Sequence, residues 1–124
     1  MKHILFVDDE AQILDALRDS LRPYRHVWKM WFAQGGAPAK DLLAYNSYDV
    51  VVSDLRMPQI NGAQLLTHVQ RVQPHATRVI LSGAAPPDLT ESVSHVAHFM
   101  LNKPCSGEAL HAVLEHFRPD APAA

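Results

Sequence analysis

The chain has 124 residues, of which 48% are hydrophobic and 19% charged, and its formal net charge at pH 7 is -2. This composition is typical of one folded domain, and it excludes both a disordered chain and the basic surface of a nucleic-acid-binding protein. The single cysteine, Cys105, excludes an internal disulfide and is typical of a reducing compartment. Since no apolar run approaches the ~20 residues of a membrane span, we expect a soluble, cytoplasmic protein that binds no membrane.

Short apolar runs alternate with amphipathic stretches along the chain. The pattern predicts a strand over residues 3–7, a helix that ends at Pro23, a strand over 26–33, a short helix over 38–45 and a strand over 50–54. It then predicts a helix over 63–72 whose buried stripe ends at Val72, a strand over 78–81, a short helix over about 87–95, a strand over 98–102 and a helix with its N-cap at Ser106. Residues 1–118 form the predicted domain, and the Pro/Ala-rich residues 119–124 form a disordered tail or linker.

The strand over 50–54 is the centre of this pattern, because its unbroken valines are typical of a strand buried on both faces. Five strand–helix units imply right-handed crossovers and an α/β fold, with one parallel sheet covered by helices on both faces. Parallel strands all end at the same edge of a sheet, so polar residues at those ends are expected to share one cleft. These residues are Asp8 and Asp9 after the first strand, Asp54 after the third, Ser82 after the fourth and Lys103 after the fifth.

Three carboxylates in one cleft repel one another and favour a bound cation. Mg²⁺ suits this site because it prefers oxygen ligands and needs only one or two carboxylates besides water and phosphate. A carboxylate nucleophile beside a metal is suited to forming an aspartyl phosphate, which makes Asp54 the candidate phosphoacceptor. The metal and the Lys103 ammonium would each neutralise a phosphoryl oxygen, and the Ser82 hydroxyl would donate to a third.

Together these motifs resemble the receiver domain of bacterial two-component response regulators. The resemblance covers about residues 2–118 and rests on Asp8-Asp9, the segment 54–58 with the Asn61-Gly62 turn, Ser82-Gly83 and Lys103-Pro104. It implies a flavodoxin-like (βα)5 fold with a doubly wound sheet of strand order 2-1-3-4-5. It also implies a signalling switch, and not an enzyme, in which Asp54 accepts a phosphoryl group from a histidine kinase or a phosphotransfer protein.

The same resemblance implies the roles of the neighbouring residues. Asp9 and Asp54 would bind Mg²⁺ directly, Arg56 would bind it through the backbone carbonyl, and Asp8 would act largely through water. Lys103 would contact the phosphoryl group. Phosphorylation would then change a surface of the fourth helix, fifth strand and fifth helix that an output domain, a partner protein or a second copy of the chain recognises.

Three positions depart from the family pattern. Met100 stands where receivers carry a switch Tyr or Phe, and the neighbouring Phe99 should point to the opposite face of its strand. A flexible Met can fill the cavity of the switch aromatic. Arg56 and Ala84 occupy the positions that tune dephosphorylation, and Ala84 cannot position an attacking water, which predicts a persistent phosphoryl state.

Other readings of the sequence remain open. A receiver-like interaction module that is independent of phosphorylation fits Met100. A phosphatase with an Asp nucleophile would carry a second Asp where Arg56 stands. The segments 21–33 and 101–105 further resemble receivers joined to HD or HDOD output domains. The eight histidines are too scattered to predict a zinc site, and Cys105 is expected to be an inert small residue.

Overall fold

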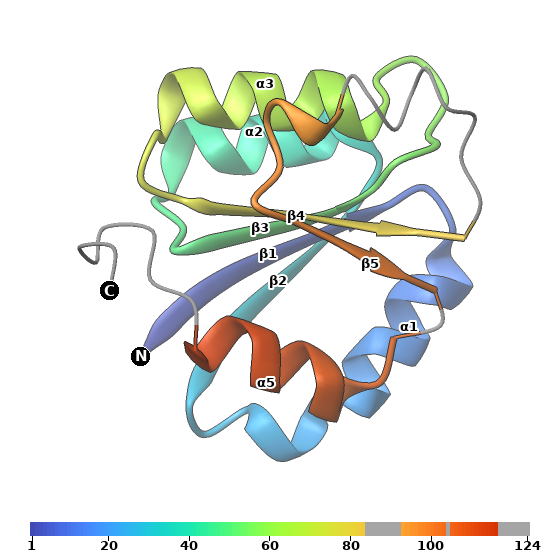
Figure 1. The fold of residues 1–124 in the computed structure, drawn as a ribbon, viewed down its shortest axis with the longest axis vertical. Coiled ribbons are helices and arrows are strands. Elements are labelled where there is room, and N and C mark those ends of the chain that lie inside the picture. The colour runs from blue at the N-terminus through green and yellow to red at the C-terminus, as the bar shows by residue number, and fades with distance from the viewer. Residues whose placement is uncertain (84–92, 104, 117–124) are drawn as a thin grey trace.

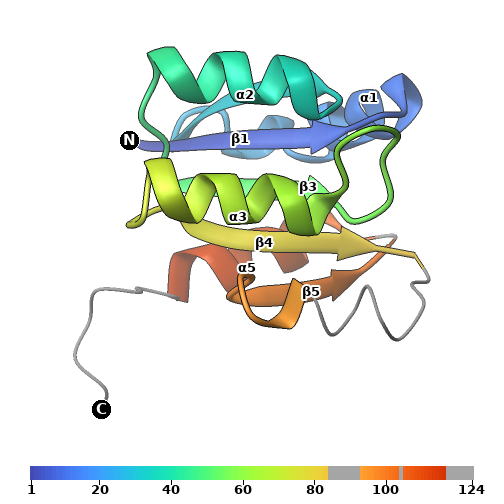
Figure 2. The same cartoon turned by 90° about the horizontal axis from the view of Figure 1, so that it is seen from above.

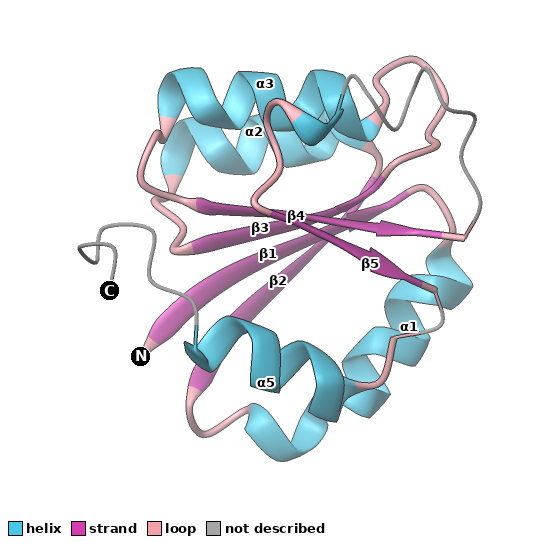
Figure 3. Cartoon of the chain, in the orientation of Figure 1, coloured by secondary structure: helices cyan, strands magenta, loops and turns pink. Residues whose placement is uncertain are grey.

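A computed structural model describes residues 1–83, 93–103 and 105–116. Its elements are β1 (Lys2–Asp8), α1 (Ala11–Ser20), the 3-10 helix η1 (Arg22–Tyr24), β2 (Trp28–Gln34), α2 (Gly36–Tyr45), β3 (Val50–Asp54), α3 (Gly62–Val72), β4 (Thr77–Ser82), β5 (Phe99–Asn102) and α5 (Gly107–His116) (Figure 3). Ala84, most of the helix predicted over 87–95 and the predicted tail lie outside the described residues. No helix in the described ranges is long and apolar enough to cross a membrane.

The five strands form one parallel sheet in the order β2-β1-β3-β4-β5. Helices α2 and α3 cover one face of this sheet, and α1 and α5 cover the other (Figure 1). Seen from above, the strands run in the same direction, so that their carboxyl ends lie at one edge (Figure 2). The predicted flavodoxin-like fold and its strand order are therefore confirmed.

The sheet separates two hydrophobic cores, and the valines of β3 serve both. Val51 packs into the core beneath α2 and α3, whereas Val50 and Val52 pack into the core with α1 and α5. All three are at most 2% exposed. An unbroken apolar run is needed here because side chains of a strand alternate between faces and both faces are covered.

Two sequence predictions about element boundaries and burial are wrong. Residues 26 and 27 form a turn instead of the start of β2, because η1 extends the chain past Pro23 and the Val27 N–H donates to the Tyr24 carbonyl at 3.0 Å. Val72 is 48% exposed although the helical stripe predicted it to be buried. It is the last residue of α3.

Side-chain caps fix the start of α3 and α5, two of the helices that follow site-bearing strands. The Asn61 side chain accepts the Gln64 N–H at 2.8 Å and the Gln64 side chain accepts the Asn61 N–H at 2.9 Å, a complete capping box at α3. At α5 the Ser106 hydroxyl accepts the Ala109 N–H at 3.0 Å, which confirms the predicted N-cap. These caps set where the loops after β3 and β5 end.

Candidate functional site

The predicted cleft at the carboxyl edge of the sheet is built around Lys103. Its ammonium nitrogen lies 2.8 Å from Asp8 Oδ2 and 3.2 Å from Asp54 Oδ1, so one cation pairs with the ends of β1 and β3. The Asp8 and Asp54 side chains are only 3% and 10% exposed. Asp8 lies 95 positions before Lys103 in the chain, and Asp54 lies between them in sequence, yet all three meet at one point because the parallel sheet brings their strand ends together.

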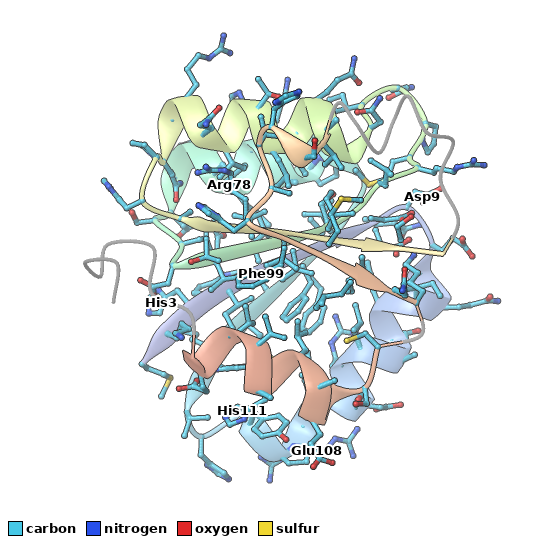
Figure 4. All side chains as sticks on the ribbon, viewed as in Figure 1. His3, Asp9, Arg78, Phe99, Glu108 and His111 are labelled. Carbon is cyan, nitrogen blue, oxygen red and sulfur yellow. The ribbon has the colours of Figure 1, made fainter. Side chains whose placement is uncertain are left out.

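The carboxylates after β1 form an acidic group. Among the described residues, Asp8, Asp9 and Glu10 offer carboxylate oxygens that all lie within 4.8 Å of one another. Asp9 projects at the opposite end of β1 from His3 (Figure 4). Asp54 is not part of this group, and the Lys103 ammonium links it to Asp8.

Glu10 was not among the predicted site residues. Its backbone N–H donates to Asp8 Oδ1 at 2.9 Å, which leaves Oδ2 of that carboxylate for Lys103. The acidic run Asp8-Asp9-Glu10 was visible in the sequence, but only the start of α1 at Ala11 turns the third acid back toward the first two. Glu10 itself is exposed.

The charges of the site are incompletely balanced. Burial raises the pKa of Asp54 above its ordinary value of 3.8, and the charges of Asp8 and Asp9 raise it further against the opposing effect of Lys103. Burial alone would lower the pKa of Lys103, but its hydrogen bonds and ion pairs with Asp8 and Asp54 outweigh burial and raise it. Lys103 is therefore charged at neutral pH, and this one ammonium is shared by two carboxylates, Asp8 and Asp54.

The other predicted site residues are placed as follows. Ser82 ends β4 and is 8% exposed, and its carbonyl oxygen accepts the Lys103 N–H at 2.9 Å. Arg56 is exposed, two residues beyond Asp54. Met100 is 39% exposed, while Phe99 packs into the core beneath α1 and α5, as the alternation of β5 predicts. Burial raises the pKa of the Cys105 thiol, consistent with an inert residue.

Comparison with known proteins decides the family. Residues 4–115 match the model of the response regulator receiver domain. The chain belongs to this family. The matched range contains β2 to β5, most of β1, the acids at the ends of β1 and β3 and the lysine after β5.

Individual relatives agree with this assignment. The transcriptional regulatory protein GlrR of Escherichia coli is 32% identical over 114 residues, which cover 91% of this chain and 25% of GlrR. A signal receiver domain of an HD domain-containing protein from Pseudomonas fluorescens is 30% identical, with a TM-score of 0.83 and coverage of 93% and 95% of the two chains. Response regulator TrrA of Thermotoga maritima, solved in complex with Mg²⁺-BeF, is 25% identical, with a TM-score of 0.79 and coverage of 93% and 97%. The chain thus spans about a quarter of the length of the curated relative.

Proposed function

We propose that this receiver domain is a phosphorylation-controlled switch whose phosphoacceptor is Asp54. The observation that supports this most strongly is the convergence of Asp54, Asp8 and Lys103, with one ammonium within 3.2 Å of two nearly buried carboxylates. A histidine kinase or a phosphotransfer protein is the proposed donor.

The residues present can divide the reaction between them. The Asp54 carboxylate oxygen forms the new bond to phosphorus while the bond from phosphorus to the donor breaks, and the donor leaves with that electron pair. The Lys103 ammonium, already 3.2 Å from Asp54 Oδ1, holds one phosphoryl oxygen and neutralises its charge. The buried Ser82 hydroxyl donates to another phosphoryl oxygen. Phosphoryl transfer needs little beyond such alignment and neutralisation.

The same cleft fits a Mg²⁺ ion. Its donors are hard carboxylate oxygens, and the oxygens of Asp8, Asp9 and Glu10 lie within 4.8 Å of one another beside Asp54, which Lys103 links to Asp8. We propose that Asp9 and Asp54 bind the ion directly, with the Arg56 carbonyl as a further ligand and Asp8 acting through water. When bound, the ion supplies neutralisation of phosphoryl charge.

Phosphorylation is proposed to change the surface around β5 and α5, which an output domain, a partner protein or a second copy of the chain would recognise. Met100, 39% exposed on β5, belongs to this surface and stands at the position of the switch aromatic. Relatives carry different outputs, since GlrR is a transcriptional regulatory protein and the Pseudomonas protein contains an HD domain. With Arg56 and Ala84 at the tuning positions, we expect slow loss of the phosphoryl group, and decay within seconds in Mg²⁺ would contradict this.

Intact-mass measurement tests the proposal. Wild-type protein incubated with acetyl phosphate and Mg²⁺ should gain one phosphoryl group of about 80 Da, and the gain should disappear in Asp54→Asn and in EDTA. The exposed acid Asp41 on α2 provides a control, because Asp41→Asn should gain the same mass as the wild type. No gain by the wild type would instead favour the interaction module that is independent of phosphorylation.

A further inference from the structure

Lys103 is held from two sides along the chain. On the amino-terminal side its backbone N–H donates to the Ser82 carbonyl at 2.9 Å, which ties it to the end of β4. On the carboxyl-terminal side, α5 begins only four residues later at Gly107. Lys103 is thus tied to the end of β4 and lies close in sequence to the start of α5.

The start of α5 is fixed by the end of α1. The Gly107 N–H donates to the hydroxyl of Ser20, the last residue of α1, at 2.7 Å. A β-carbon on Gly107 would lie 2.5 Å from the Ser20 carbonyl oxygen, so the two helix ends are in backbone contact. The hydroxyl of Ser106, the helix's own cap, binds the Ala109 N–H. Ser20 thus supplies a second cap to α5 from a distant part of the sequence.

Among the described residues, Lys103 and Ser20 line the same cavity. This cavity has a volume of about 440 Å³, and its described lining comes from α1, the end of β4 and the residues after β5: Ile13, Ala16, Leu17, Ser20, Leu81, Lys103 and Cys105. Side chains that border a cavity have no packing partners in that direction. Ser20, whose hydroxyl accepts the Gly107 N–H, is one of the residues that border this cavity.

We propose that Ser20 is a positioning residue for Lys103: by holding the first N–H of α5, its hydroxyl sets where the Lys103 ammonium meets the oxygens at Asp54. This rests on the proposed role of Asp54 as phosphoacceptor. Ser20 is not itself one of the residues that contact the reacting atoms.

Two variants distinguish the loss of the Ser20 hydroxyl from a general loss of folding. Ser20→Ala removes the acceptor and leaves the Gly107 N–H without it, whereas Ser20→Thr keeps a hydroxyl. We expect Ser20→Ala to lower the maximal rate of phosphorylation by acetyl phosphate about three- to tenfold, less than the roughly hundredfold that a 1 Å misplacement can cost. Ser20→Thr should stay within about twofold of the wild type. Ser47→Ala, at an exposed position on the opposite edge of the sheet, is the matched control and should leave the rate unchanged.

A second readout does not require phosphorylation. Competitive labelling of amines with acetic anhydride, followed by peptide mapping, compares the accessibility of Lys103 with that of Lys40 on α2. Ser20→Ala should raise labelling of Lys103 relative to Lys40 several-fold, and Ser20→Thr and Ser47→Ala should not. Unchanged Lys103 labelling in Ser20→Ala, or failure of Ser20→Thr to restore the wild-type pattern, would overturn the inference. If the variants change acetylation of Lys103 as expected but the wild type takes up no phosphoryl group, the proposed function fails while the role of Ser20 in positioning Lys103 stands.

Discussion

Gly62, the first residue of α3, lies directly against the backbone of Asp54. A β-carbon on Gly62 would overlap the Asp54 carbonyl oxygen and would lie 2.9 Å from the α-carbon of Leu55. The Gly62 N–H also donates to the Leu55 carbonyl at 2.8 Å. The loop after β3 therefore folds back onto the strand end that carries the candidate phosphoacceptor, and only glycine permits this approach.

Gly62→Ala should displace the Asp54 backbone and destabilise the protein by about 1–3 kcal/mol, the usual range for overpacking. This loss opposes the gain in helix propensity that an alanine would otherwise bring at this position. Urea unfolding measures the free energy, and acetyl phosphate labelling measures the effect on Asp54. Gly83→Ala is the control for stability, since a β-carbon there meets no atom of the described residues within 4 Å. Equal stability of Gly62→Ala and the wild type would contradict the close approach.

Asp54→Asn should increase the free energy of unfolding at pH 7 in EDTA. Burial and the neighbouring acids raise the pKa of Asp54 in the folded state above the ordinary value of 3.8. As pH rises from 3.8 through the folded-state pKa, the unfolded chain ionises Asp54 more readily, and the folded protein loses stability. The asparagine removes this cost, and Lys103 keeps its 2.8 Å contact with Asp8. Urea unfolding at pH 7 checks the gain, with Asp41→Asn expected to stay within about 0.5 kcal/mol of the wild type. A less stable Asp54→Asn would show that the pair with Lys103 outweighs burial.

Acid should weaken the amino-terminal edge of the sheet through His98. Its Nδ1 accepts the Arg78 N–H at 2.9 Å, while the Arg78 guanidinium donates to the Val96 carbonyl at 2.6 Å. Burial, aided by the charge of Arg78, lowers the pKa of His98 below 6.5. The unfolded chain therefore binds a proton first, and the stability that neutral His98 contributes is lost as pH falls from 6.5 through the folded-state pKa.

His98→Asn keeps a side-chain acceptor but does not titrate, so it should lose less stability than the wild type between pH 7.5 and about 5.5. Urea unfolding at the two pH values measures the difference. His75→Asn, which changes an exposed histidine before β4, should retain the pH dependence of the wild type. Parallel losses in His98→Asn and the wild type would mean that His98 does not govern this part of the acid response.

Gln59 occupies a left-handed backbone conformation, with φ of 69°, in the loop between β3 and α3. Gln59→Gly should stabilise the protein by about 0.5–1 kcal/mol, because the strain of about 1–2 kcal/mol for an L-residue exceeds the entropic cost of glycine. Thermal unfolding measures the gain. Gln59→Ala keeps the β-carbon and is expected to give none, so an equal gain from alanine would assign the effect to the lost side chain and not to the backbone.

The parts of the site that depend on the topology of the sheet were predicted correctly from the sequence. Asp8, Asp54 and Lys103 lie far apart in the chain, yet buried apolar runs located their strand ends and a parallel sheet brings such ends together. Contacts that depend on how a helix end packs were not predictable. Neither the cap that Ser20 supplies to α5 nor the turn of Glu10 toward Asp8 follows from a spacing. The strand was predicted to start too early, at residue 26, because η1 occupies the chain before it. A 3-10 helix of three residues is too short to leave a periodic pattern in the sequence.

Chemical location of the phosphoryl group tests the central claim most directly. Borohydride reduces an acyl phosphate, so a phosphorylated aspartate is converted to homoserine, whereas phosphate esters are not reduced. After incubation with acetyl phosphate and Mg²⁺ and then reduction, peptide mapping should find homoserine at position 54 and unchanged aspartate at Asp8 and Asp9. Homoserine at Asp8 or Asp9, or at no position in a protein that retains its fold, would contradict the assignment of Asp54 as the phosphoacceptor.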